Sequence, residues 1–267
     1  MIKNFFNKLK IINNNVNLND EERFKEHKKN LNEKKMLKSC YSDFYIKMLN
    51  TEKEFKKKTS NNNLRIELGS GVGFIKDYDK TIITSDVIYN EFTDKIIDAN
   101  QIPYGRNQID SIFGIFCFHH FKDPFNFLKD LEVKLKSGGV CILIEPYYGA
   151  LAKVIYKSIH KSEYFDQNEP FDFKIENKTA MEQANQALSY IYFVKNREKL
   201  QKFFPNLEIV HTSIFGNYLR FILSGGLNFR KILPDFLIGF IKIIEKFLSP
   251  LKKILGVHYM IVIKKTS

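Results

Sequence analysis

An apolar run that ends in three spaced glycines constrains this chain more than any other feature. The sequence LRIELGSGVGF at residues 64–74 places these glycines at Gly69, Gly71 and Gly73. Such a run is typical of a buried parallel strand that turns sharply, and glycine lets a ligand lie almost against the backbone. We expect a helix over residues 72–78 whose first amide groups face that ligand. The stretch therefore predicts a ligand-binding loop on a doubly wound α/β sheet.

Strand and helix patterns alternate after this loop, as a mostly parallel sheet requires. The expected strands lie at residues 64–68, 81–86, 95–97, 110–118, 140–145, 207–214 and 257–264, with a further short strand at 191–194. The expected helices lie at residues 124–135, 149–160 and 197–204. Pro124 suits a first helical turn, and Gly138 and Gly139 follow the expected end of that helix. These patterns predict one α/β domain over residues 63–267.

Three segments lie outside the alternating pattern. Residues 1–62 are rich in Lys and Asn and carry helical patterns near 20–31 and 41–55, so we expect a helical extension that caps the sheet or the ligand cleft. Residues 146–205 are expected to form an insertion on the substrate side. Residues 215–256 are too long for a hairpin turn and predict an amphipathic insertion between the last two strands.

The net charge of +12 is concentrated at the two ends of the chain. Residues 1–62 hold 15 Lys and Arg against 8 Asp and Glu, and residues 229–267 hold 8 against 2. The centre holds 19 against 20, whereas an enzyme of nucleic acids more often carries its positive charge around the active cleft. We therefore expect no nucleic-acid partner and favour contact of the ends with an anionic membrane surface. A coding bias toward Lys and Asn is the alternative explanation.

The cysteines and the apolar segments indicate the cellular setting. Cys40, Cys117 and Cys141 are odd in number and lack the spacing of metal ligands, so neither a disulfide framework nor a metal site is expected. No signal peptide is apparent, and no run is long and uncharged enough to span a bilayer. The sequence predicts a cytoplasmic protein, with the inner face of the membrane as a further location.

The spacing of the glycines argues against a dinucleotide site. The motif G-x-G-x-x-G needs a third glycine where this chain has Phe74. The loop reads instead Glu67-x-Gly69-x-Gly71-x-Gly73, and two acids follow it at strand ends, Asp86 and Asp98. Further along, Asp110 opens the fourth expected strand, the turn FHHFKDP follows at residues 118–124, and KSGG lies at residues 136–139.

Together these motifs resemble the class I S-adenosylmethionine (SAM) methyltransferases, and the histidine-containing turn resembles their type-11 group. The resemblance covers residues 64–146 and implies a Rossmann-like sheet of seven strands, mostly parallel with an antiparallel last strand. It also implies that the chain is a methyltransferase that binds SAM and releases S-adenosylhomocysteine. The cofactor-binding residues that it implies are Glu67, Gly69, Ser70, Gly71, Gly73, Asp86, Val87, Asp98, Ala99 and Phe116. In this family the acid at the position of Asp86 binds the ribose, and the acid at Asp98 receives the adenine amino group; the alternative is that both acids only cap the next turn.

Methyl transfer needs in-line placement of donor and acceptor, and an oxygen or nitrogen acceptor also needs a base that takes its proton. His119 and His120 are expected at the carboxyl end of the fourth strand, the edge where such sheets bind ligands. Glu145 ends the fifth strand at the same edge and is a further candidate. The alternative for the histidines is a structural turn that packs over the cofactor. Cys117 is expected to be a core residue.

The acceptor pocket is expected to come from segments outside the common core. Residues 145–148, 160–166 and 184–188 mix aromatic, acidic and amide groups, which suits a polar, hydroxyl-rich small molecule. These segments resemble uncharacterised type-11 methyltransferases encoded near bacterial surface-polysaccharide genes. The favoured function is O-methylation of a sugar or glycolipid intermediate, with a small or lipid-linked substrate. Methylation of a quinone or another lipid-like ring, and SAM binding without turnover, are the alternatives.

Residues 236–250 predict a strongly apolar helix with basic neighbours, Arg230, Lys231, Lys252 and Lys253. A helix with a wide apolar side either packs on the protein or lies in a membrane interface. Packing is the commoner outcome, but a lipid-linked acceptor would explain both this helix and the charged ends.

Overall fold

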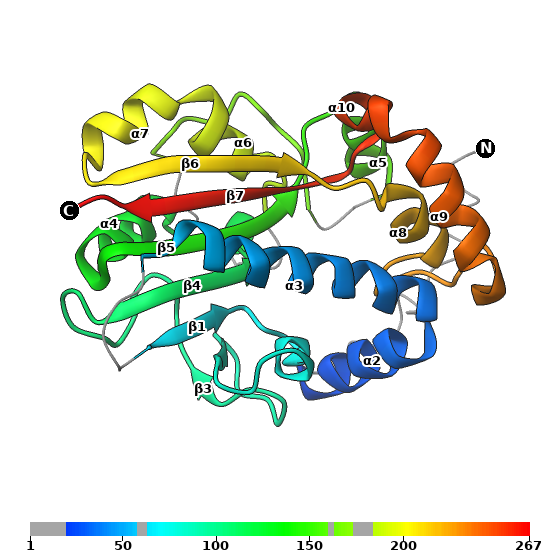
Figure 1. Cartoon of the computed structure of the whole chain (residues 1–267), viewed down its shortest axis with the longest axis horizontal. Coiled ribbons are helices and arrows are strands. Elements are labelled where there is room, and N and C mark those ends of the chain that lie inside the picture. Colours follow the sequence, from blue (N-terminus) through cyan, green and yellow to red (C-terminus); the bar gives the residue numbers. More distant parts are fainter. Residues whose placement is uncertain (1–19, 58–62, 160–162, 173–183) are drawn as a thin grey trace.

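The computed structural model describes residues 20–57, 63–159, 163–172 and 184–267. Its centre is a seven-stranded sheet in the order β3-β2-β1-β4-β5-β7-β6 (Figure 1). The strands are β1 Arg65–Leu68, β2 Ile83–Asp86, β3 Lys95–Ile96, β4 Ile109–Ile115, β5 Leu135–Pro146, β6 Leu207–Ile214 and β7 His258–Lys265. β1 to β5 pair in parallel, and β7 runs antiparallel to both of its neighbours, β5 and β6. This arrangement confirms the predicted fold class.

Helices cover both faces of the sheet (Figure 1). They are α2 Asp20–Glu33, α3 Lys35–Phe55, α4 Pro124–Lys134, α5 Ala150–Ile159, α6 Leu188–Tyr190, α7 Arg197–Phe203, α8 Tyr218–Ser224, α9 Ile238–Phe247 and α10 Lys252–Leu255. Side chains alternate along β4, so that Phe113 packs with the α3 side and Ile112 packs with the α4 side. Every residue of β4 is buried, which explains why its sequence is almost uniformly apolar.

The start of α4 follows its sequence signals. Asp123 precedes the helix, its carboxylate accepts the amide of Asn126 at 2.9 Å, and Pro124 occupies the first position. Proline loses little there because the first amides of a helix have no partner within the helix. The prediction of this helix start was therefore correct.

Two predicted elements differ from the structure. Residues 191–194 form part of a π-helix, Ile191–Lys195, and not a strand. Ile191, Tyr192 and Phe193 are all buried, and a short run buried on every side cannot be distinguished from a strand by its periodicity. The helix expected after the glycine loop is a single 3₁₀ turn, Phe74–Asp77, too short to offer a row of free amide groups to a ligand.

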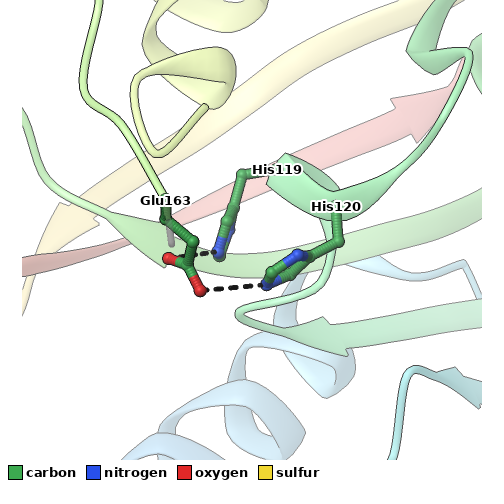
Figure 2. A group of neighbouring side chains, drawn as sticks. All are labelled: His119, His120 and Glu163. Atoms are coloured by element: carbon green, nitrogen blue, oxygen red, sulfur yellow. Dashed lines mark ion pairs between the residues drawn. The ribbon is translucent and has the colours of Figure 1, made fainter. Parts of the chain in front are cut away.

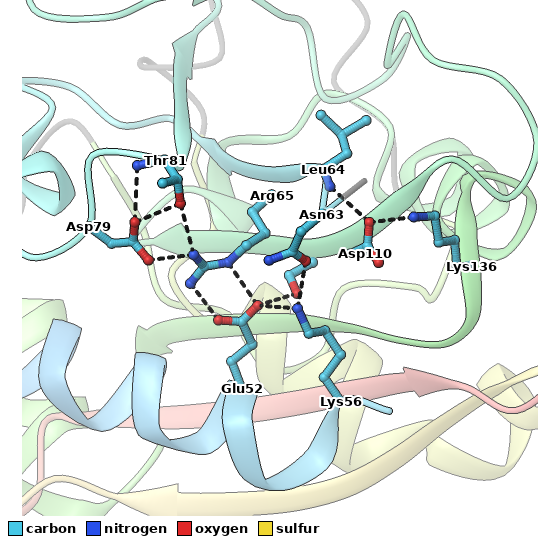
Figure 3. Close-up of polar contacts among 10 residues, drawn as sticks. Glu52, Lys56, Asn63, Leu64, Arg65, Asp79, Thr81, Asp110 and Lys136 are labelled. Carbon is cyan, nitrogen blue, oxygen red and sulfur yellow. Dashed lines mark hydrogen bonds and ion pairs between the residues drawn. The ribbon is translucent and has the colours of Figure 1, made fainter. Parts of the chain in front are cut away.

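A buried polar network fixes α3 to the sheet (Figure 3). The carboxylate of Glu52 accepts hydrogen bonds from Arg65 Nε at 2.9 Å, from Arg65 Nη2 at 2.6 Å and from Ser111 Oγ at 2.6 Å. Arg65 also pairs with Asp79, and Lys56 Nζ lies 3.1 Å from Glu52. The helical extension is thereby joined to β1 and β4 through groups that are almost inaccessible to water.

Asp110 belongs to the same end of the sheet, opposite the glycine loop. Its carboxylate accepts the amide of Leu64 at 2.8 Å and pairs with Lys136 at 2.6 Å (Figure 3). The acid that opens the fourth strand is thus a structural residue at the amino ends of the strands.

Candidate cofactor and acceptor site

A cavity of about 600 Å³ lies at the carboxyl ends of the parallel strands. Most of the predicted site residues line it: Gly69, Ser70, Gly71, Asp86, Val87, Asp98, Ala99, Phe116, His119 and His120. Three predicted residues do not line it: Glu67, Gly73 and Glu145. The helical extension adds Arg23, Phe24, His27, Tyr41 and Tyr45, none of which the sequence motifs had indicated.

The glycine loop has the backbone that its sequence predicts. Gly69, Gly71 and Gly73 have φ values of 60°, 53° and 64°, in the left-handed region that side chains rarely adopt. A Cβ on Gly73 would lie 2.3 Å from the carbonyl oxygen of Phe92, whereas a Cβ on Gly71 would meet no atom within 4 Å. Gly73 therefore permits close packing of the protein, and Gly71 leaves open space at the wall of the cavity.

The two strand-end acids differ in their surroundings. Asp86 Oδ2 accepts the amide of Gly71 at 3.0 Å, which ties the end of β2 to the glycine loop. Burial raises the pKa of Asp86, while the amides of Gly71 and Ile88 oppose that rise. Asp98 is exposed and its Oδ1 accepts the amide of Asn100 at 2.8 Å, so it does cap the turn after β3. Both residues nevertheless line the cavity.

Glu67 carries a buried carboxylate that lacks a hydrogen-bond partner in the described part of the chain. Burial raises the pKa of Glu67 to about 7. The hydroxyls of Ser70 and Tyr45 lie near enough to favour the charged form, but they do not have the geometry of hydrogen bonds to the carboxylate. An unpaired buried carboxylate is costly, and a nearby cation stabilises it. SAM carries a sulfonium and an ammonium group, so a buried carboxylate directly before the glycine loop fits SAM.

Phe116 follows β4 in a left-handed conformation, with φ of 54°. Such a conformation is uncommon for an aromatic residue and is retained where the surroundings enforce it. Its amide donates to the carbonyl of Ile144 at 2.8 Å, and its ring packs against Tyr41 and His258. His258 is buried among aromatic rings, and this burial lowers its pKa to about 3. This histidine is therefore neutral and adds to the aromatic wall of the cavity.

His119 is oriented by Glu145. Glu145 Oε2 lies 2.6 Å from His119 Nδ1, and Oε1 accepts the amides of Cys117 and Phe118 at 3.0 and 2.9 Å. Burial alone would lower the pKa of His119, but the charge and hydrogen bond of Glu145, with a smaller effect of Glu163, raise it. The geometry gives Glu145 a positioning role and leaves Nε2 of His119 on the cavity side.

Glu163 completes a polar cluster with the two histidines (Figure 2). Its oxygens lie 3.9 Å from His119 Nε2 and 3.8 Å from His120 Nε2. Gln186 donates to Glu163, and its own Oε1 has no protein partner among the described residues although it is buried at the cavity. Glu163 and Gln186 come from two segments expected at the acceptor pocket, but no motif singled out either residue.

Comparison with known proteins agrees with this geometry. Residues 67–143 match a protein-family model described as a methyltransferase domain. The match over residues 67–143 confirms the resemblance to SAM-dependent methyltransferases that the motifs predicted, and the order of the strands agrees with the fold expected from that resemblance. No curated protein matches the chain.

Solved structures are similar to the chain at low sequence identity. One is phosphoethanolamine N-methyltransferase 2 of Haemonchus contortus, at 12% identity and a TM-score of 0.45, over 84% of this chain and 53% of that chain. Another is geranyl diphosphate C-methyltransferase of Streptomyces coelicolor A3(2), at 9% identity and a TM-score of 0.46, over 90% of this chain and 83% of that chain. The chain spans about half the length of the Haemonchus protein.

Proposed function

We propose that the protein transfers the methyl group of SAM to a hydroxyl of a sugar or glycolipid intermediate held at a membrane surface. The observation that carries this proposal is the cavity itself, which joins the glycine loop to a polar cluster and to an apolar wall. A protein that only binds SAM would not need the oriented histidine at the second end of the cavity.

The donor end contains the groups that would hold SAM. Asp86 would receive the ribose hydroxyls, Asp98 the adenine amino group, and the open backbone at Gly71 the methionine part. When bound, SAM supplies a methyl group that is already activated by the sulfonium. The protein then has to align the acceptor with that methyl group and exclude water.

The acceptor end is polar on one side and apolar on the other. A hydroxyl group at this end would find several hydrogen-bonding partners, in His119, His120, Glu163 and Gln186. Because Glu145 occupies Nδ1 of His119, Nε2 is the nitrogen that would take the proton of the acceptor hydroxyl. Other residues of the cavity lining are apolar: Ile155, Phe221, Ile222, Leu227 and Val257. A molecule with a hydroxyl-bearing head and a lipid part matches this division.

The helix α9 supports the membrane part of the proposal because its apolar side faces outward. Its polar residue Glu245 points inward and pairs with Arg220 of α8 at 2.7 Å. The exposed apolar side chains of this segment, here called the stripe, are Phe240, Ile243 and Phe247 of α9 together with Phe236, Leu251 and Ile254 in the residues around it. Exposed lysines flank the stripe at Lys242, Lys246, Lys252 and Lys253.

This stripe fits an anionic lipid surface. An apolar helix face of this kind is normally covered, and basic flanks favour negatively charged head groups over an uncharged protein groove. Within the described ranges, no helix combines the length and the apolarity needed to cross a bilayer. α9 packs on α8, whose Phe221 and Ile222 line the cavity, so a lipid-linked acceptor would enter next to the surface that holds its tail.

Calorimetric titration with S-adenosylhomocysteine tests the donor site. We expect the protein to bind it and not NAD, and we expect Asp86→Ala to weaken binding by about tenfold to a hundredfold, because hydrogen bonds to a charged partner are lost. Asp77→Ala is the matched control, since Asp77 is an exposed acid outside the cavity lining. Binding of NAD without S-adenosylhomocysteine would overturn the assignment of the donor.

Sedimentation with phosphatidylglycerol vesicles tests the membrane surface. We expect the triple variant Phe236→Ser, Phe240→Ser and Phe247→Ser to bind the vesicles more weakly than the wild type. Each replaced phenylalanine should reduce partitioning by at least about tenfold, because a large apolar side chain is no longer transferred from water into the lipid. Phe203→Ser is the control, because this ring is also exposed but lies on α7, away from the stripe. Equal partitioning of the wild type and the triple variant would refute the proposed surface while leaving the donor site untouched.

A further inference from the structure

The polar cluster at the acceptor end has the composition of a metal site. His119, His120 and Glu163 each offer one ligand atom, and these atoms all lie within 4.8 Å of one another (Figure 2). Two imidazoles and one carboxylate form a ligand set that suits divalent transition ions such as Zn²⁺. Sequence spacing predicted no metal, because the third ligand lies far along the chain from the two histidines.

The second contact of His119 is typical of a metal-binding histidine. Its Nδ1 lies 2.6 Å from Glu145, whose carboxylate is itself fixed by two backbone amides. Histidines that bind metals usually donate one ring N–H to a carboxylate, which fixes the ring and leaves the other nitrogen for the ion. Glu163 is held in a similar way by Gln186. The supporting contacts therefore exist on both sides of the cluster.

We propose that His119, His120 and Glu163 bind one divalent transition ion, with Zn²⁺ as the reference ligand, and leave its remaining positions open to the cavity. Ligand atoms around tetrahedral zinc lie about 3.4 Å apart, so the cluster has to contract slightly on binding. His120 and Glu163 are only partly buried, with 19% and 14% of their side chains exposed, and can make this adjustment.

The role of the ion rests on the proposed function, but its binding does not. A hydroxyl that coordinates such an ion is more acidic than a free hydroxyl. With the ion bound, His119 Nε2 would be a ligand and not a base. The ion would make the acceptor hydroxyl more acidic, and the proton of that hydroxyl would pass to water as its oxygen takes the methyl group from the sulfonium. Without the ion, the proposed methyl transfer still has His119 to take that proton.

Titration of the chelator-treated protein with Zn²⁺ tests the site. We expect one ion per chain, and we expect His120→Ala and Glu163→Gln each to weaken binding by more than about tenfold. Glu145→Gln should weaken binding by about 10- to 100-fold, because its amide cannot accept from His119 and from both backbone amides at once. His211→Ala and Glu208→Gln are matched controls on β6, outside the cavity lining, and should bind Zn²⁺ as the wild type does.

A second readout separates this site from adventitious binding and from misfolding. Co²⁺ in place of Zn²⁺ should give a visible absorption band that His120→Ala abolishes, while the far-ultraviolet circular dichroism and the urea unfolding transition of the same variant stay as in the wild type. Absence of Zn²⁺ binding, or binding that His120→Ala and Glu163→Gln leave unchanged, would overturn the metal site. If the wild-type protein does not bind S-adenosylhomocysteine, that result would instead contradict the proposed function.

Discussion

Replacing Glu52 by Gln should lower the free energy of unfolding by about 3–5 kcal/mol, the loss typical of a broken buried ion pair. Glu52 holds the guanidinium of Arg65 through two hydrogen bonds and also accepts from Ser111 Oγ. A neutral amide leaves the buried guanidinium without its main counter-charge and places an N–H group where the network needs an acceptor. Urea unfolding followed by circular dichroism measures the change.

The matched control for this variant is Glu21→Gln. Glu21 pairs with Lys25 on the surface of α2, with about 70% of the Glu21 side chain exposed. Water screens the charges of an exposed pair of this kind, so the control should unfold almost as the wild type does. Similar losses in the two variants would show that the network at Arg65 does not carry the attachment of α3 to the sheet.

A second large effect is expected at the glycine loop, where two neighbouring glycines should respond differently. Gly71→Ala should weaken binding of S-adenosylhomocysteine by about tenfold to a hundredfold, because its methyl group occupies space that the ligand needs. The open surroundings of Gly71 limit the loss of stability to about 1–2 kcal/mol, the cost of a left-handed alanine. Calorimetry and urea unfolding measure the two quantities separately.

Gly73→Ala provides the contrast. Its Cβ would lie 2.3 Å from the carbonyl oxygen of Phe92, and neither backbone segment can move without disturbing the loop. The loss of stability should therefore exceed that of Gly71→Ala. If Gly71→Ala binds S-adenosylhomocysteine normally, the ligand does not lie against the loop and the donor site has to be placed elsewhere in the cavity.

Much of the sheet could be predicted because its signals are local. The apolar run in β4, the glycines after β1 and the proline at the start of α4 each reflect a backbone requirement at their own position. The π-helix at Ile191–Lys195 could not be predicted, since its side chains are buried all round and tertiary packing decides its backbone.

The residues of the site also fall into two groups, those that local sequence signals predict and those that only tertiary packing brings together. Asp86 is the last residue of its strand, so its place beside the glycine loop could be predicted from the sequence. Glu163 and Gln186 come together with the histidines only through the path of residues 146–190, which no short motif encodes. The outward apolar side of α9 is a similar case, because the pairing of Glu245 with Arg220 decides which side of the helix faces the protein.

The position of β7 has a consequence for how the chain assembles. β7 lies between β5 and β6, although residues 215–257 separate it from β6 along the chain. During synthesis β6 therefore emerges before the strand that will pair with it, and its hydrogen-bonding edge stays open while α8, α9 and α10 are being made. The sheet can close only after the helices that carry the exposed apolar stripe have been built.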